Sequence, residues 1–126
     1  MGFEEKRQHR RAYIRLSVEY RGKSSWQMIE ARDISVGGMF IVTEAVEPPN
    51  TEVEVMFEFG EGEKNKKFVQ AKGVVAWNRK KEIRDEDGNV QPAGMGIKFT
   101  KLSPLSAKDF INEAVKKLEE NTDAQA

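Results

Sequence analysis

Two arginines near the start of the sequence have the residue type and spacing to bind an anion. Arg7 and Arg11 stand four positions apart in the basic stretch KRQHRR, residues 6–11. A guanidinium group is planar and permanently charged, and it can form paired hydrogen bonds to a phosphate or to the O6 and N7 atoms of guanine. The spacing therefore predicts an anion-binding arm, although a solvated basic segment is the simpler interpretation.

A second stretch, DISVGG at residues 33–38, carries the complementary chemistry. The Asp33 carboxylate can accept hydrogen bonds from the N1–H and exocyclic amine of guanine, whereas adenine presents an acceptor at N1. Ser35 adds a hydroxyl group, and Gly38 lets the backbone approach a flat ring closely. The same residue types are common in turns. Together the two stretches predict a site for phosphate and guanine.

No enzyme chemistry is recognisable elsewhere. The chain has no cysteine and one histidine, His9, which excludes the usual thiol and His-cluster metal sites. His9 lies in the basic stretch without an orienting carboxylate at a recognisable spacing, so we interpret it as solvated. The glutamates at 52, 54 and 58 alternate with apolar residues and face solvent rather than forming an acid–base pair. We expect a protein that is not an enzyme and has no metal and no cofactor.

Length and charge limit the remaining function classes. A chain of 126 residues suits one domain. The 21 Lys and Arg residues balance 21 Asp and Glu residues, which argues against bulk nucleic-acid or membrane-surface binding. No stretch has transmembrane length, and the N-terminus lacks the apolar run of a signal peptide. We expect a cytoplasmic protein without membrane insertion.

Most of the chain alternates apolar and polar residues with the period of half-buried strands. Six strands are predicted, over residues 13–20, 25–35, 37–43, 52–60, 68–79 and 93–102. Gly73 is expected to mark a bulge or bend, and the charged residues 80–92 are expected to form an excursion between strands. Because closure removes exposed strand edges, the sequence predicts a mainly β fold, a small six-stranded antiparallel barrel over residues 12–103.

The pattern changes to a helical period after Pro104. Ser106 and Asp109 fit an N-terminal capping box. One apolar stripe follows, formed by Phe110, Ile111, Ala114, Val115 and Leu118. The sequence therefore predicts a helix over 104–120 that packs on the barrel, followed by a frayed tail over 121–126.

Residues 1–11, which carry the arginine pair, are expected to form a flexible arm. They contain too few apolar side chains to offset the entropy that ordering would cost.

The two stretches together resemble the motifs of the PilZ domain family. RQHRR (residues 7–11) matches the family's RxxxR motif, and DISVGG matches its DxSxxG motif. The intervening strand pair and the later stretches GVVAWNR and GMGIKFTKLS are also similar, so the resemblance covers roughly residues 5–118. It implies a bacterial receptor for cyclic di-GMP (c-di-GMP) that changes conformation on binding and signals through an unidentified protein partner.

The resemblance also implies residue roles. Arg7 and Arg11 would bind the phosphates and guanines, Asp33 and Ser35 would hold a guanine, and Gly38 would give it room. Three neighbouring positions could add ligand contacts: Lys6, Arg10 and Gly37.

Two alternatives remain open from the sequence. A small barrel with a basic arm could bind single-stranded nucleic acid, but no array of exposed aromatic residues is recognisable and the net charge is zero. No DNA or RNA partner is therefore expected. The domain could also be a ligand-free interaction scaffold, against which the complete motifs argue.

The two tryptophans have a simpler interpretation. Trp26 and Trp77 lie in apolar strands, so we interpret both as packing residues of the core or barrel surface rather than ligand contacts. Met39, Phe40 and Ile41 are interpreted as strand core.

Overall fold

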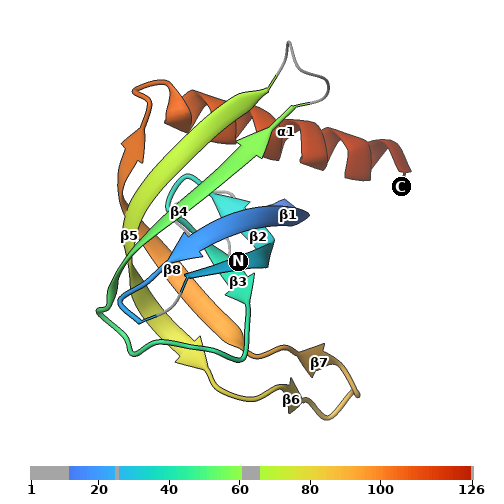
Figure 1. The fold of residues 1–126 in the computed structure, drawn as a ribbon. Helices are drawn as coiled ribbons and strands as arrows, with labels where there is room; N and C mark the ends of the chain where they lie inside the picture. The colour runs from blue at the N-terminus through green and yellow to red at the C-terminus, as the bar shows by residue number, and fades with distance from the viewer. Residues whose placement is uncertain (1–11, 25, 61–65, 126) are drawn as a thin grey trace.

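The computed structural model describes residues 12–24, 26–60 and 66–125. In this part of the chain the fold is a closed antiparallel barrel with one helix (Figure 1). Around the barrel the strands follow the order β1-β2-β3-β8-β5-β4. Their bounds are β1 Ala12–Arg21, β2 Trp26–Ser35, β3 Gly38–Val42, β4 Glu52–Phe59, β5 Lys67–Arg79 and β8 Gly94–Ser103. The predicted six-stranded barrel is confirmed.

The core forms because every second side chain of each strand points into the barrel. In β4 the inward residues Val53, Val55 and Phe57 are buried, while the intervening Glu54 and Met56 lie nearer to solvent. The pairing of β5 with β8 shifts register between Lys72 and Gly73, and the extra residue is Thr100 of β8. The predicted irregularity at Gly73 is therefore a bulge in the partner strand opposite Gly73.

The excursion between β5 and β8 contains a short hairpin that the sequence pattern did not predict. Its strands are β6 (Ile83–Arg84) and β7 (Val90–Gln91). The turn is organised by Asp85, whose carboxylate oxygen accepts hydrogen bonds from the backbone N–H groups of Asp87 and Asn89, both at 2.9 Å. Two residues per strand are too few to show the alternation by which longer strands are recognised.

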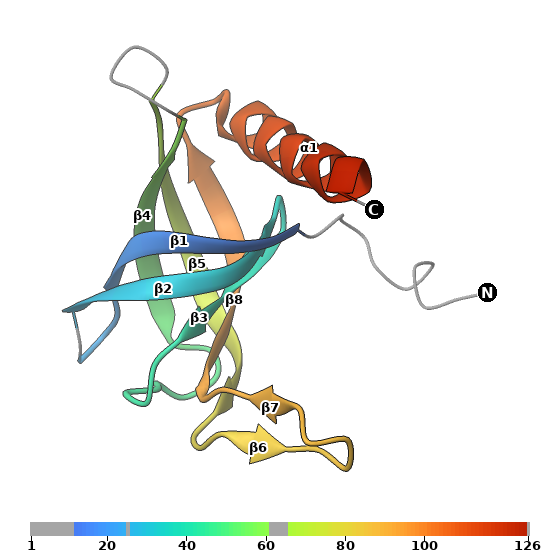
Figure 2. The same cartoon turned by 90° about the vertical axis from the view of Figure 1, so that its right-hand side faces the viewer.

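The helix α1 (Ala107–Gln125) lies across one end of the barrel and contacts β1, β2, β5 and β8 (Figure 2). Its buried side chains, Ala107, Ile111 and Val115, recur every four residues. Ile111 and Val115 belong to the predicted apolar stripe, and Phe110 of that stripe packs partly buried against the core. The side chain of Leu118, also assigned to this stripe, lies outside the described part. The helix extends beyond residue 120, its predicted end, because neither Gly nor Pro occurs in residues 121–125.

A buried carboxylate joins the loop after β3 to the turn between β1 and β2. Glu47 is 4% exposed and accepts hydrogen bonds from the Tyr20 hydroxyl, from the backbone N–H groups of Lys23 and Ser24, and from the Ser24 hydroxyl. Burial raises the pKa of the Glu47 carboxyl, but the hydrogen bonds outweigh burial and hold this pKa below its ordinary value. Burial, together with the hydrogen bond to Glu47 and its negative charge, raises the pKa of Tyr20.

In the ranges that the structure describes, no helix is both long and apolar enough to cross a membrane.

Candidate ligand-binding site

The second motif forms the tight connection between β2 and β3. Ser35 ends β2 and pairs with Gly38 at the start of β3. The Ser35 hydroxyl oxygen accepts a hydrogen bond from Gly37 N at 3.1 Å, and the Gly37 carbonyl accepts one from Phe99 N at 2.9 Å. Ser35 is 2% exposed. Its hydroxyl therefore stabilises the turn and keeps a proton to donate, and its contact with a ligand stays a prediction.

Gly38 has a packing role that the sequence pattern did not reveal. A Cβ atom at this position would lie 2.0 Å from the carbonyl oxygen of Ile97 on β8. No side chain fits there unless β3 moves away from β8. The structure thus requires glycine for the close approach of two strands, whereas its predicted role of giving room to a guanine stays a prediction.

A β-bulge in β2 turns Asp33 toward the outer surface. Ala31 pairs with Ile41 but Asp33 pairs with Phe40, so Arg32 is an extra residue in β2. The bulge breaks the alternation, and Ala31 and Ile34 are both buried while Asp33 lies between them on the outer face. The Asp33 Oδ1 atom accepts a hydrogen bond from Phe40 N at 3.1 Å.

Beside Asp33, two aromatic rings stack on the outer surface. Phe40 on β3 and Trp77 on β5 both pair with Gly96 of β8, which lies between them. A Cβ atom on Gly96 would lie 2.2 Å from the Trp77 indole nitrogen, so glycine lets the indole lie across β8. The two rings are nearly parallel at an interplanar angle of 12°, with centroids 5.3 Å apart. Trp77 remains 43% exposed.

A guanidinium group completes this surface. The Cζ atom of Arg79 lies 5.2 Å from the Trp77 ring centroid and 5.6 Å from that of Phe40, within the range of cation–π attraction. Its Nη1 atom donates a hydrogen bond to the carbonyl oxygen of Pro92 at 2.9 Å, which fixes the group in place. We call Asp33, Phe40, Trp77 and Arg79 the stacking surface. It offers a carboxylate acceptor, a partly exposed indole and a cation on one surface.

Trp77 packs on the barrel surface, one of the two placements that the sequence allowed, and not in the core. The register of β5 shifts between Val75 and Trp77, so a second bulge turns Trp77 outward, where a strict period of two from Val75 would place it in the core. Phe40 is buried, but beneath Trp77 and Arg79 on the outer side rather than in the barrel interior. The sequence signal for this flat surface is the pair of glycines in GMGIKF (residues 94–99).

The first motif lies outside the described residues, and with it Lys6, Arg7, Arg10 and Arg11. The described part fixes where the arm joins the barrel, because Ala12 pairs with Ile34 and Tyr13 pairs with Asp33. The chain therefore enters β1 beside the second motif, and Arg11 is bonded directly to Ala12.

Comparison with known proteins agrees with this architecture. The family model described as PilZ domain matches residues 5–115. A search of the curated proteins found no match. Among solved structures, the PilZ domain with c-di-GMP of YcgR from Escherichia coli has a TM-score of 0.64 and 12% sequence identity, over 95% of this chain and 96% of that one.

Two longer proteins contain a similar fold. The inhibitor of motility MotI/DgrA from Bacillus subtilis has a TM-score of 0.72 and 14% identity, over 91% of this chain. The K. pneumonia MrkH–c-di-GMP complex has a TM-score of 0.63 and 15% identity, over 95% of this chain. The matches span only 52% and 55% of those two chains, respectively. At these identities the likeness shows the fold alone.

Proposed function

This chain belongs to the PilZ domain family, a family of c-di-GMP receptors, and we propose that it binds c-di-GMP between its N-terminal arm and the stacking surface. PilZ domains are typically non-catalytic receptors. The observation that carries the proposal is the placement of Asp33 beside Phe40, on which the partly exposed Trp77 stacks, at the point where the arm enters β1.

The stacking surface suits a guanine base. The exposed face of Trp77 offers a platform for a flat ring, a contact worth about 1–3 kcal/mol per base. An ionised carboxylate has about four acceptor positions. Asp33 can therefore keep its hydrogen bond from Phe40 N while it accepts two more from the N1–H and amine of guanine.

The arm supplies what the stacking surface lacks. Arg7 and Arg11 carry the charges that two ligand phosphates require, with Lys6 and Arg10 of the arm and Gly37 of the turn between β2 and β3 as further contacts. Three arginines within five residues repel one another, and a doubly anionic ligand relieves that repulsion. Ligand binding thereby draws the arm onto the barrel and creates a new surface for a protein partner.

Calorimetric titration tests this function. The full chain is titrated with c-di-GMP, with c-di-AMP and with a single-stranded oligonucleotide. Only c-di-GMP should give saturable binding, and its affinity should fall as salt rises because ionic contacts are screened. If the oligonucleotide binds with equal or higher affinity, the chain is a nucleic-acid-binding protein instead. If none of the three ligands binds, it is a ligand-free interaction scaffold.

Asp33 is expected to select guanine over adenine. Asp33→Ala should weaken c-di-GMP binding by about tenfold or more and reduce the discrimination against c-di-AMP, because a buried polar group left without its partner rejects a ligand strongly. Asp33→Asn is the matched variant, since its amide oxygen can still accept from Phe40 N while its NH₂ group opposes the guanine donors. Calorimetry with both dinucleotides measures the selectivity. Complete exclusion of c-di-AMP by both variants would assign guanine selection to the arginines instead.

A further inference from the structure

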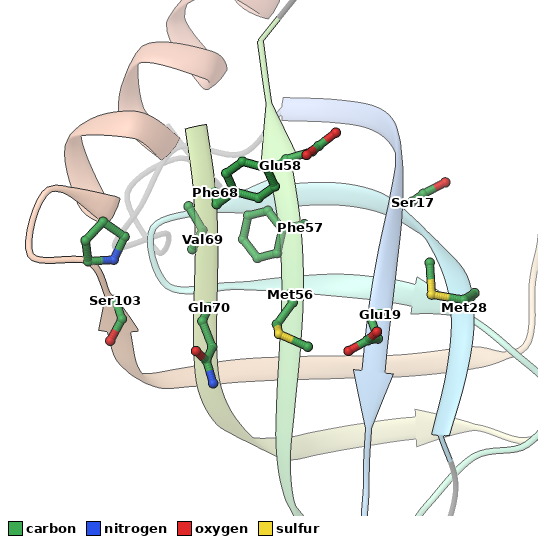
Figure 3. Close-up of a pocket in the computed structure, with 11 residues that line it drawn as sticks. Ser17, Glu19, Met28, Met56, Phe57, Glu58, Phe68, Val69, Gln70 and Ser103 are labelled. Carbon is green, nitrogen blue, oxygen red and sulfur yellow. The ribbon is translucent and has the colours of Figure 1, made fainter. Parts of the chain in front are cut away.

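The outer surface opposite the stacking surface contains an apolar groove of about 660 Å³. One register-aligned row of side chains crosses it: Met28, Glu19, Met56, Gln70 and Ser103 (Figure 3). Phe68, Glu58 and Ser17 lie beside the row. In the barrel order, β1 and β4 at the centre of this groove are opposite β8 and β3 at the centre of the stacking surface.

The groove exposes large apolar side chains that the fold does not use. Met28 is 69% exposed and Phe68 is 64% exposed, although both could have been polar at outward strand positions. Methionine and phenylalanine are enriched at protein interfaces, and methionine adapts its shape to different partners. A concave surface lined by such residues is typical of a docking site.

The charge of the groove is one-sided. Glu19 and Glu58 line it, and no Lys or Arg is among the described residues that do. The cations near these carboxylates are held at the margin, with Arg21 Nε 3.4 Å from Glu19 and Lys66 Nζ 3.7 Å from Glu58. The Lys66–Glu58 pair is exposed and therefore weak, and the buried Glu19 Oε2 atom accepts no hydrogen bond among the described residues, so an incoming Lys or Arg can bind both carboxylates.

The closed barrel decides how a partner can dock. β1 pairs with β4 only from Glu19 to Arg21, but the strands under the row from Met28 to Ser103 are all hydrogen-bonded to their neighbours at that level. A partner that lies over this row therefore binds through side chains. An amphipathic helix does so by placing its apolar face in a hydrophobic groove.

We propose that this groove binds a basic amphipathic helix of a partner protein, with its apolar side chains between Met28 and Phe68 and its Lys or Arg residues beside Glu19 and Glu58. The inference rests on the proposed function in that it identifies the surface through which the receptor contacts its partner. A second copy of this chain is disfavoured, because a symmetric contact would bring the acidic groove against itself.

Methyl NMR of the methionine side chains tests the groove directly. The probe is a synthetic helix of about 18 residues built from Leu and Lys, and the control peptide has Glu in place of Lys. The Leu/Lys peptide should shift the Met28 and Met56 methyl signals saturably. The signals of Met39 and Met95, which are 1% and 0% exposed in the core, serve as internal controls and should not move.

Variants assign the binding to named side chains. Phe68→Ser should lower the affinity for the Leu/Lys peptide by about tenfold. The double variant Glu19→Gln with Glu58→Gln should bind the Leu/Lys and Leu/Glu peptides equally well. Ile83→Ser is the control, because Ile83 is 51% exposed on β6 outside the groove. None of these variants should change c-di-GMP affinity.

The outcomes separate this inference from the proposed function. Equal binding of both peptides, or no shift at Met28 and Met56 while c-di-GMP binds normally, overturns the groove proposal alone. If the Met28 and Met56 methyl signals shift with protein concentration in the absence of peptide, and sedimentation shows a dimer, the groove binds a second copy of this chain and the helix proposal is overturned. Saturable Leu/Lys binding in a protein that does not bind c-di-GMP retains the groove and rejects the receptor function.

Discussion

Alanine in place of Arg7 or Arg11 is expected to remove measurable c-di-GMP binding and to leave the barrel folded. Loss of a charge-assisted, largely desolvated contact typically costs about 2–5 kcal/mol, which lowers affinity by roughly 30- to 4,000-fold. The motif precedes β1, so neither change touches the described core. Calorimetry measures the affinity, and thermal unfolding measures the fold.

Two controls separate specific recognition from general charge. Lys101→Ala removes one positive charge from an exposed position on β8, five residues beyond Gly96, and should leave affinity nearly unchanged. Arg11→Lys keeps the charge but loses the paired geometry of the guanidinium, so it should bind weakly. If both alanine variants still bind c-di-GMP, the arm does not contribute to the binding site.

Glu47→Ala is expected to destabilise the fold strongly. It leaves the hydroxyl of Tyr20 and the backbone N–H groups of Lys23 and Ser24 without their acceptor, and Tyr20 is fully buried. The expected loss is about 2–4 kcal/mol in the free energy of unfolding, or roughly 10 °C in melting temperature. Denaturant unfolding measures it. Glu44→Ala, an exposed glutamate of the same loop, should change stability by no more than about 0.5 kcal/mol.

Acid should reduce this contribution of Glu47. The folded pKa of its carboxyl is lower than the ordinary value of 4.5, so the unfolded chain binds more protons between the two values and stability rises with pH there. The stabilisation is complete above about 4.5 and is lost as pH falls through the folded pKa. The stability difference between the wild type and Glu47→Gln should therefore narrow on acidification. A constant difference from neutral to acidic pH would contradict this assignment.

The barrel was predictable because its strands are long and carry their apolar side chains on one face. The alternation over Val53, Val55 and Phe57 fixes which face of β4 is buried, and Gly73 stands where the pairing of β5 with β8 shifts register. The helix was predictable for the same reason, from the period of Ile111 and Val115.

The outward surfaces were less predictable, because they depend on pairings between distant residues. A single extra residue, Ala76, reverses the face of Trp77, and nothing in the local pattern indicates that bulge. Glu47 and Tyr20 are 27 positions apart and meet only when the barrel closes. The groove likewise requires the register that aligns Met28 with Glu19 and Met56.

The outward placement of both indoles makes the protein its own optical reporter. Trp26 is 67% exposed on β2, two residues from Met28 of the groove, with the Arg21 guanidinium 5.7 Å from its ring centroid. Trp77 belongs to the stacking surface across the barrel. Each surface thus carries one polarity-sensitive fluorophore. Trp26→Phe leaves emission from the stacking surface alone, and Trp77→Phe leaves emission from the side of the groove alone, so binding at each surface can be followed separately in two unlabelled variants.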